Sequence, residues 1–200
     1  MPLASAAASF DGGLYTWVTE LAQRSPAALD SVVRVWSDYG LALFALLMLL
    51  AWWRSRSAAP ARTAAALCAP LVVVAAYLAN DLVKSLFHEQ RPCRTLHVVT
   101  VEACPGIGDW SFPSNHAAIA AAAAVALWLT DRRLGAIAVP AALLMAASRV
   151  WIGVHYPHDV LVGLVTGALV AAVLTVAARR CGPVVERLRE SPLRPLVTAR

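Results

Sequence analysis

Charged residues are scarce in this 200-residue chain, in which Asp, Glu, Lys and Arg make up only 14% of the sequence. A typical soluble domain carries about 25%, so this shortage excludes a soluble globular protein. Cysteine is also rare, and four cysteines cannot form a disulfide scaffold in a chain of this length. A mean hydropathy of +0.64 excludes a disordered chain, whose signature is low hydrophobicity. An integral membrane protein remains.

What the chain does contain is a series of long apolar runs, since 60% of its residues are hydrophobic. A membrane-spanning helix needs about 20 mostly apolar residues to cross a hydrocarbon core about 30 Å thick. Five segments meet or approach this length, the third being short for a span, at about residues 33–53, 63–86, 117–130, 134–154 and 158–178. The predicted fold class is all-α, a polytopic membrane bundle of five transmembrane helices.

The N-terminal 32 residues are too polar to form a further full span. Tyr15 and Trp17 suit the headgroup level, where an apolar ring with a polar tip is favoured. We therefore expect an amphipathic interfacial helix here, with partial insertion at the outer face as the alternative. The expected organisation is an interfacial segment at 1–32, a membrane-embedded domain at 33–180 and a basic cytoplasmic tail at 181–200.

The net charge of +5 does not indicate nucleic-acid binding, because the basic residues form no stripe interleaved with aromatics. They gather instead at the ends of the apolar runs. With five spans, eleven of them fall on one side of the membrane and six on the other: Arg54, Arg56, Arg62, Arg132, Arg133, Arg179, Arg180, Arg187, Arg189, Arg194 and Arg200, against Arg24, Arg34, Lys84, Arg91, Arg94 and Arg149. Basic residues favour the cytoplasmic side, so we expect the first group to be cytoplasmic.

Ionisable groups at membrane depth are costly and usually face a polar interior, which makes each one a functional candidate. Here such groups, with two serines, fall at the outer ends of the second to fifth spans or in the loops between them: Lys84, Arg91, Ser114, His116, Ser148, Arg149, His155 and Asp159. A five-helix bundle brings those ends together. The sequence therefore predicts one polar pocket at the extracytoplasmic face of a bacterial plasma-membrane protein.

These residue types suit phosphoryl transfer. Lys84 and Arg91 supply positive charge, the fork of Arg149 can hold two phosphate oxygens, and Ser114 can donate to a third. The run from Pro113 to Ala117 opens the third span, so backbone N–H groups of a helix N-terminus can point at the same phosphate. Together these groups form a predicted anion clamp.

The same pocket contains groups suited to nucleophilic and acid–base chemistry. His155 precedes Asp159 by four residues, which places both on one helix face. A carboxylate that holds one imidazole nitrogen leaves the other free to act as a nucleophile. His116 is then a second imidazole, able to protonate a leaving oxygen.

These residues resemble the three signature motifs of the type 2 phosphatidic acid phosphatase superfamily, which shares its site with vanadium haloperoxidases. The matching elements, in the family's order, are Lys84-x6-Arg91-Pro92, Pro113-Ser114-Asn115-His116 and Ser148-Arg149-x5-His155-x3-Asp159. The resemblance implies an all-helical phosphatase that needs neither metal nor cofactor, with a lipid phosphate in the membrane as its substrate. It implies that His155 forms a phosphohistidine, that Asp159 orients it and that His116 protonates the leaving group. Phosphate would be held by Lys84, Arg91, Ser114, the Asn115 backbone N–H and Arg149.

The chain departs from the family pattern at Asn115, where glycine is usual. Asparagine is among the few other residues that tolerate left-handed backbone conformations, and it preserves an N–H donor. A non-glycine residue here is also found in small bacterial members similar to undecaprenyl diphosphate phosphatases, whose length this chain matches.

The first expected substrate is thus undecaprenyl diphosphate or a related polyprenyl diphosphate, hydrolysed to the monophosphate and inorganic phosphate. Phosphatidic acid, phosphatidylglycerol phosphate and a phosphorylated decaprenyl sugar lipid are the alternatives. From other classes, a transporter or lipid-binding scaffold would place its charges near the bilayer midplane, often in broken helices. The oligomeric state is left open.

Several further residues have two interpretations at this stage. Ser148 either contacts phosphate or packs against a neighbouring helix, and Pro113 supports the second motif. Cys93 and Cys104 share the outer loop and are either joined in a disulfide or free thiols. Three other histidines lie near the pocket without a zinc-binding spacing, so we interpret them as loop or supporting residues: His88, His97 and His158.

Overall fold

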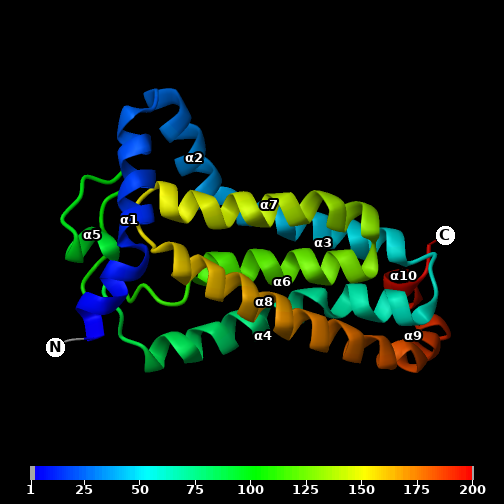
Figure 1. Ribbon diagram of the computed structural model, residues 1–200. Coiled ribbons are helices and arrows are strands. Elements are labelled where there is room, and N and C mark those ends of the chain that lie inside the picture. Colours follow the sequence, from blue (N-terminus) through cyan, green and yellow to red (C-terminus); the bar gives the residue numbers. More distant parts are fainter. Residues whose placement is uncertain (1–2, 200) are drawn as a thin grey trace.

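The computed structural model describes residues 3–199, with side chains from Asp11 onward, and this part of the chain contains helices and no strands. Figure 1 shows long helices packed lengthwise, with a short helical hairpin standing out at one end. In chain order the helices are α1 (Leu3–Arg24), α2 (Ala27–Tyr39), α3 (Leu41–Ser55), α4 (Pro60–Leu86), α5 (Pro92–Thr95), α6 (Asn115–Thr130), α7 (Arg132–Trp151), α8 (Pro157–Ala178), the 3-10 turn η1 (Arg179–Cys181), α9 (Gly182–Arg189) and α10 (Arg194–Val197).

The predicted all-α membrane bundle is confirmed, although its spans differ in detail from the expected ones. The helices α4, α7 and α8 are long and apolar enough to cross a membrane, and α6 is a shorter apolar helix. The first expected span, at about residues 33–53, corresponds to two helices, because α2 and α3 pass the same test together as a pair bent by 50°.

The bend falls at Gly40, where the chain passes close to α7. A Cβ atom at this position would lie 2.4 Å from the Trp36 carbonyl oxygen and 2.8 Å from the Cε atom of Met145. Only glycine fits so close to its neighbours. The apolar pattern of residues 33–53 does not reveal this close packing at the bend.

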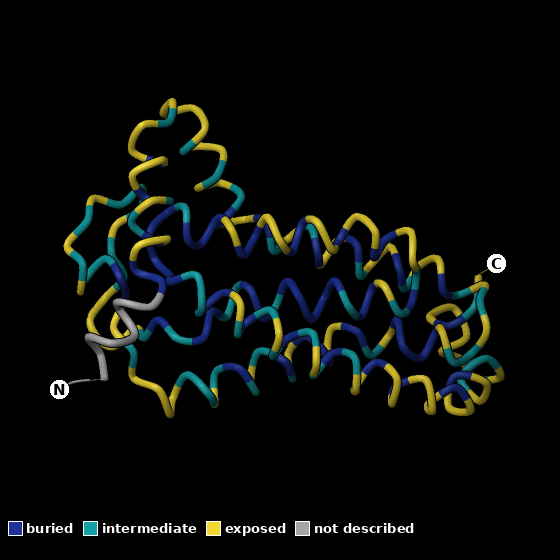
Figure 2. Tube along the Cα trace, in the orientation of Figure 1, coloured by how far each residue is buried: buried dark blue, intermediate teal, exposed yellow. Residues whose placement is uncertain are grey.

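The alanine-rich helix α6 forms the centre of the bundle, and Figure 2 shows it buried along most of its length. Helix α8 meets it almost at backbone contact, because Cβ atoms at Gly163 and Gly167 would lie 2.4 Å and 2.1 Å from the Ser114 and Ala118 carbonyl oxygens. Small residues permit this close approach between membrane helices. The outer surfaces of the bundle carry largely exposed leucines, as a lipid-facing surface requires: Leu46, Leu71, Leu82, Leu144 and Leu169.

Helix α1 packs on the bundle through Tyr15, which we expected at the headgroup level. Its side chain is instead fully buried within the protein. Its ring lies 5.6 Å from that of Tyr156, and its hydroxyl donates to the Gly153 carbonyl oxygen at 2.8 Å. A buried tyrosine needs such a partner for its hydroxyl. Trp17, on the same helix, is 61% exposed.

The two ends of the bundle are built differently (Figure 1). One end carries α1, α5, the long connection from Phe87 to Ser114 and the turn between α7 and α8. The other end carries the α3–α4 and α6–α7 turns and the C-terminal helices, which fold back onto α4 through Val185 and Val197 packed against Ala64.

Candidate active site

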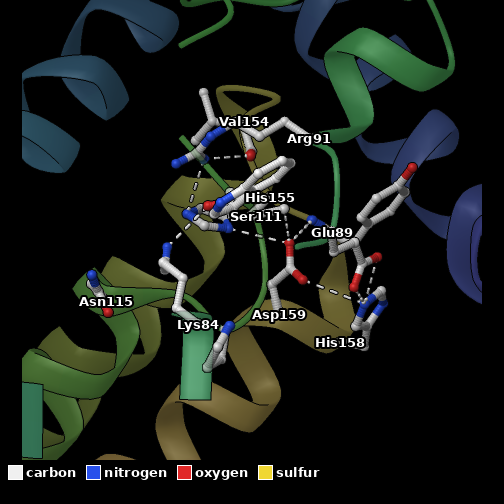
Figure 3. Close-up of polar contacts among 12 residues, drawn as sticks. Lys84, Glu89, Arg91, Ser111, Asn115, Val154, His155, His158 and Asp159 are labelled. Atoms are coloured by element: carbon white, nitrogen blue, oxygen red, sulfur yellow. Dashed lines mark hydrogen bonds and ion pairs between the residues drawn. The ribbon is translucent and has the colours of Figure 1, made fainter. Parts of the chain in front are cut away.

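The residues singled out from the sequence lie at one end of the bundle, each at the terminus of a helix or in an adjoining loop, and Figure 3 shows Lys84, Arg91, His155 and Asp159 among them. Lys84 is in the last turn of α4, Arg91 is the N-cap of α5, Ser114 is the N-cap of α6, Arg149 is in the last turn of α7, His155 is in the α7–α8 turn and Asp159 is in the first turn of α8. Separate helices thus supply one polar cluster.

The buried pair His155 and Asp159 is the centre of this cluster. The Nδ1 atom of His155 lies 3.2 Å from the Asp159 Oδ2 atom. The same oxygen accepts a hydrogen bond from the Tyr156 backbone N–H at 2.8 Å and another from the Ser111 hydroxyl. These donors hold the carboxylate in place, so Asp159 fixes the orientation of the imidazole and leaves Nε2 available.

The Nε2 atom of His155 faces the Arg91 Nη1 atom at 3.3 Å. Burial lowers the pKa of His155 to about 4, and the bond to Asp159 opposes this shift only in part. The imidazole is therefore neutral near pH 7. With the proton on Nδ1, directed to Asp159, the lone pair of Nε2 can act as a nucleophile.

Arg91 is buried and is held in a fixed position from two sides. Its Nη1 donates to the Val154 carbonyl at 2.8 Å, its Nε donates to the Asp109 carbonyl at 3.0 Å, and its Nη2 pairs with the Asp109 carboxylate at 2.9 Å. Partial burial raises the pKa of the Asp109 carboxyl. The hydrogen bond and the positive charge of Arg91 lower that pKa by more, so it ends below its ordinary value. Asp109 was not predicted from the sequence.

Two buried donors of the predicted clamp have no hydrogen-bond partner among the described residues, namely the Ser114 Oγ and the Arg149 Nε atoms. Arg149 is otherwise positioned by its Nη1, which donates to the Ser37 hydroxyl at 2.7 Å. An unpaired buried donor is costly, so these groups fit a site that receives an anion. Burial and helix position thus support the clamp that the sequence predicted.

The remaining predicted residues of the clamp are Lys84 and Asn115. The Nζ atom of Lys84 donates to the Trp110 carbonyl at 3.0 Å. The side chain of Asn115 donates to Asp81 at 3.1 Å and accepts a bond from Asn80 at 2.7 Å. Asn115 begins α6 in ordinary helical geometry, so the tolerance of asparagine for left-handed conformations plays no part here.

The second histidine of the motifs, His116, is in the first turn of α6 and is half-buried. It lies within electrostatic range of Arg149, His155 and Lys84. This position places an imidazole beside the cluster on the α6 side, where it can exchange a proton with a group bound at the clamp.

The residues with two interpretations are also placed. The Ser148 hydroxyl donates to the Met145 carbonyl of its own helix at 2.7 Å, which is a packing arrangement. The Pro113 carbonyl accepts a bond from Asn80 at 3.4 Å. Cys93 and Cys104 are joined in a disulfide, with their Cα atoms 5.9 Å apart.

Sequence reasoning missed several residues that hold the site together. Ser111 is fully buried against Asp159, and Asn80 and Ser37 support Asn115 and Arg149. The one hint of Ser111 in the sequence was its position three residues before Ser114. The others come from distant helices, and no spacing pattern marks them.

Several carboxylates surround His158, which we interpreted as a supporting residue. Glu89, His158 and Asp159 each offer a ligand atom within 4.8 Å of the others, so these three residues could hold a metal ion. The Nε2 atom of His158 lies 3.2 Å from a Glu89 carboxylate oxygen and 3.3 Å from an Asp159 carboxylate oxygen. Figure 3 shows this group directly beside the His155–Asp159 pair.

Comparisons with known proteins agree with this arrangement. The chain matches the PAP2 superfamily over residues 65–183. It is 31% identical over 150 residues to the undecaprenyl-diphosphatase BcrC of Bacillus subtilis, covering 74% of this chain and 72% of that protein. It is 40% identical over 94 residues to a decaprenylphosphoryl-5-phosphoribose phosphatase of Mycobacterium tuberculosis, covering 46% of this chain and 50% of that protein.

A solved structure shares the fold. The crystal structure of a transmembrane PAP2-type phosphatidylglycerolphosphate phosphatase from Bacillus subtilis is similar with a TM-score of 0.58 and 21% identity, covering 88% of this chain and 90% of that chain. The family match covers more than half of the 200 residues and includes most of the site. The chain therefore belongs to the PAP2 superfamily, and it is a membrane phosphatase.

Proposed function

We propose that this protein hydrolyses a polyprenyl diphosphate, undecaprenyl diphosphate first among them, to the monophosphate and inorganic phosphate. The observation that carries the proposal is the pairing of a neutral, oriented nucleophile, His155, with two buried and unpaired donors, on Ser114 and Arg149. The similarity to the undecaprenyl-diphosphatase of Bacillus subtilis extends over 74% of the chain and supports this substrate.

The mechanism follows from the positions of the side chains. The Nε2 atom of His155 attacks the terminal phosphorus, and the bond to the leaving oxygen breaks in line. Arg91, Arg149 and Ser114 stabilise the negative charge on the equatorial oxygens. His116 gives its proton to the leaving oxygen of the lipid monophosphate.

The second half of the reaction reverses these roles. A water molecule attacks the phosphohistidine, His116 accepts a proton from that water, and the P–N bond breaks to return His155 and release inorganic phosphate. Asp159 keeps the Nδ1–H of His155 oriented and stabilises the charge that develops on the ring. No residue is consumed, and one water molecule is added overall.

The active-site end is proposed to face the extracytoplasmic side of a bacterial plasma membrane, opposite the arginine-rich end. Of the sixteen basic residues that the structure describes, ten belong to the opposite end and six to the active-site end, and Lys and Arg favour the cytoplasmic side. The substrate phosphate would then be displayed in the outer leaflet while its chain stays in the bilayer.

The test is release of inorganic phosphate by the purified enzyme in detergent with EDTA present, from lipids at equal surface density. The lipids are undecaprenyl diphosphate, phosphatidic acid, phosphatidylglycerol phosphate and a phosphorylated decaprenyl sugar lipid. We expect undecaprenyl diphosphate to have the highest kcat/KM. Preference for one of the other three would overturn the substrate assignment, and loss of all release with EDTA would overturn the metal-independent mechanism.

A further inference from the structure

The end of the bundle opposite the active site contains an open cavity of about 700 Å³ that the proposed reaction does not use. Its lining combines the α3–α4 and α6–α7 turns with the end of α8, and five arginines contribute: Arg54, Arg62, Arg132, Arg133 and Arg179. We call this the arginine cavity. A neighbouring cavity of about 1070 Å³ adds Arg56 and Arg194, with the Arg56 guanidinium 3.5 Å from the centre of the Trp53 ring.

The charge of the arginine cavity is only partly neutralised. Its acidic lining residue, Asp131, accepts a hydrogen bond from Arg54 at 2.8 Å and caps α7 through the backbone N–H of Arg133 at 3.0 Å. Among the described residues, Arg62, Arg132 and Arg133 form no ion pair through their side chains. The cavity therefore keeps a positive charge that attracts an anion.

The position of the cavity identifies the anion. Trp128 lines it and is 43% exposed, and tryptophan is enriched at membrane interfaces. Guanidinium groups match phosphate oxygens in pairs, and basic pockets between membrane helices bind anionic headgroups. We propose that the arginine cavity binds the phosphate headgroup of an anionic phospholipid in the leaflet opposite the active site.

The test compares lipid retention by two double variants of the full-length protein. Arg62→Gln with Arg133→Gln removes two charges from the cavity. Arg180→Gln with Arg187→Gln removes two charges from exposed positions at the same end but outside the cavity lining, and it is the matched control. Each protein is mixed with phosphatidylglycerol or phosphatidylcholine in detergent, and bound lipid is counted by native mass spectrometry.

We expect the wild type and the control to retain phosphatidylglycerol at least about tenfold better than the cavity variant, a difference of about 1.4 kcal/mol, with no such difference for phosphatidylcholine. Equal loss in both double variants would overturn the proposal, because a general surface potential would then explain binding. Displacement of the lipid by millimolar inorganic phosphate would assign the cavity to free phosphate instead of a lipid.

A separate observation concerns His158, whose two ring nitrogens both face carboxylates. Its Nδ1 atom lies 2.8 Å from the Asp11 Oδ2 atom, and its Nε2 atom lies 3.2 Å from Glu89 and 3.3 Å from Asp159. Both ring nitrogens of His158 are thus engaged by carboxylates.

The imidazole of His158 is well placed to hold Asp159. The Asp159 Oδ2 atom is used by His155, Tyr156 and Ser111, while its buried Oδ1 atom has no hydrogen bond among the described residues. The imidazole of His158 faces that second oxygen and is stacked on the Tyr156 ring at 5.3 Å. We infer that His158 is a positioning residue, which fixes the Asp159 carboxylate for His155.

This inference rests on the proposed phosphatase function, and a double-mutant cycle tests it. His158→Phe keeps the stacking but removes both N–H groups. We expect kcat on an aryl phosphate to fall about tenfold with KM within twofold, and no further fall when the same change is made in Asp159→Asn. His88→Phe is the control, since His88 packs on Trp110 at the same end.

Equal losses in the wild-type and Asp159→Asn backgrounds would overturn the positioning role. If His158→Phe does not fold, Asp11→Asn weakens the same contact and enters the same cycle, with an expected loss of about threefold. The Nδ1–H proton resonance of His155 gives a readout without turnover and should shift in His158→Phe. An unchanged resonance contradicts this inference, whereas a wild type without phosphatase activity contradicts the proposed function alone.

Discussion

The two ends of the bundle both concentrate positive charge, but they hold it in different ways. At the active-site end, Arg91 and Arg149 are buried, and each guanidinium is fixed by specific partners such as Asp109 and Ser37. At the opposite end, the five arginines that line the arginine cavity are exposed.

The difference reflects what each end must bind. A buried cation is expensive unless hydrogen bonds and charges compensate for its lost hydration, and that compensation also fixes its geometry. Fixed donors favour a transition state, whose charge develops at defined positions. Exposed arginines attract an anion without holding it in a single geometry, which suits a lipid headgroup. One end is thus organised for chemistry and the other for attraction.

The largest expected effect separates the proton donor from the rest of the active site. His116→Ala should lower kcat on a lipid diphosphate by about a thousandfold, because a poor leaving oxygen needs its proton. On an activated aryl phosphate, whose leaving group needs little protonation, the loss should be about tenfold. Steady-state kinetics on both substrates measure this ratio. Equal losses on the two substrates would mean that His116 binds phosphate instead.

A smaller effect should distinguish two buried serines at the same end. Ser114→Ala removes an unpaired donor and should lower kcat/KM by about a hundredfold, as the loss of one charge-stabilising donor does in other enzymes. Because the Ser114 hydroxyl has no partner among the described residues, the melting temperature should hardly change. Ser148→Ala is the control and should keep kcat/KM within twofold. A large loss in Ser148→Ala would show that this serine also contacts phosphate.

The pKa of the buried His155 should differ from that of an exposed histidine. Its pKa is lowered to about 4 by burial, below the ordinary value of 6.5. The neutral, nucleophilic form should therefore persist as the pH falls from 7 to about 5. Unfolding exposes an imidazole that binds a proton more readily, so this group should destabilise the fold as the pH falls below about 6.5. An NMR titration of labelled histidines measures the value, and a midpoint near 6.5 would contradict the account.

The sidedness of the two ends can be compared directly in intact cells. With the four native cysteines replaced by serine, Ile107→Cys in the outer loop should react with a membrane-impermeant thiol reagent, since Ile107 is 91% exposed. Ser57→Cys, in the α3–α4 turn, should react only after the cells are opened. The reverse pattern would place the active site in the cytoplasm and remove the proposed outer-leaflet substrate.

Much of the site could be predicted from the sequence because its residues sit at helix ends with fixed spacings. His155 lies in the turn just before α8, Asp159 lies in its first turn, and Ser114 opens α6, so their spacings in the sequence bring them close to their positions. The membrane bundle followed from the apolar runs in the same way. Local patterns were sufficient wherever the contact lay within one helix or at its end.

The features that could not be predicted depend on contacts between distant segments. Ser37 meets Arg149 across 112 residues, and Asp11 meets His158 across 147 residues. Gly40, at the bend, packs closely against Met145 of another helix. Tyrosine is a residue type common at the membrane interface. The Tyr15 ring is nevertheless buried, with Tyr156 packed against it and the Gly153 carbonyl bonded to its hydroxyl. Periodicity and composition do not carry this information.

The most direct test of the account is capture of the covalent intermediate on His155. The enzyme is mixed with substrate, quenched in alkali, which preserves phosphohistidine, and digested for mass spectrometry. The account predicts one phosphate on the His155 peptide of the wild type, more of it in a variant with slowed hydrolysis, and none in a folded His155→Ala protein. Phosphate on another residue, or rapid turnover by His155→Ala, would contradict the assignment of His155 as the nucleophile.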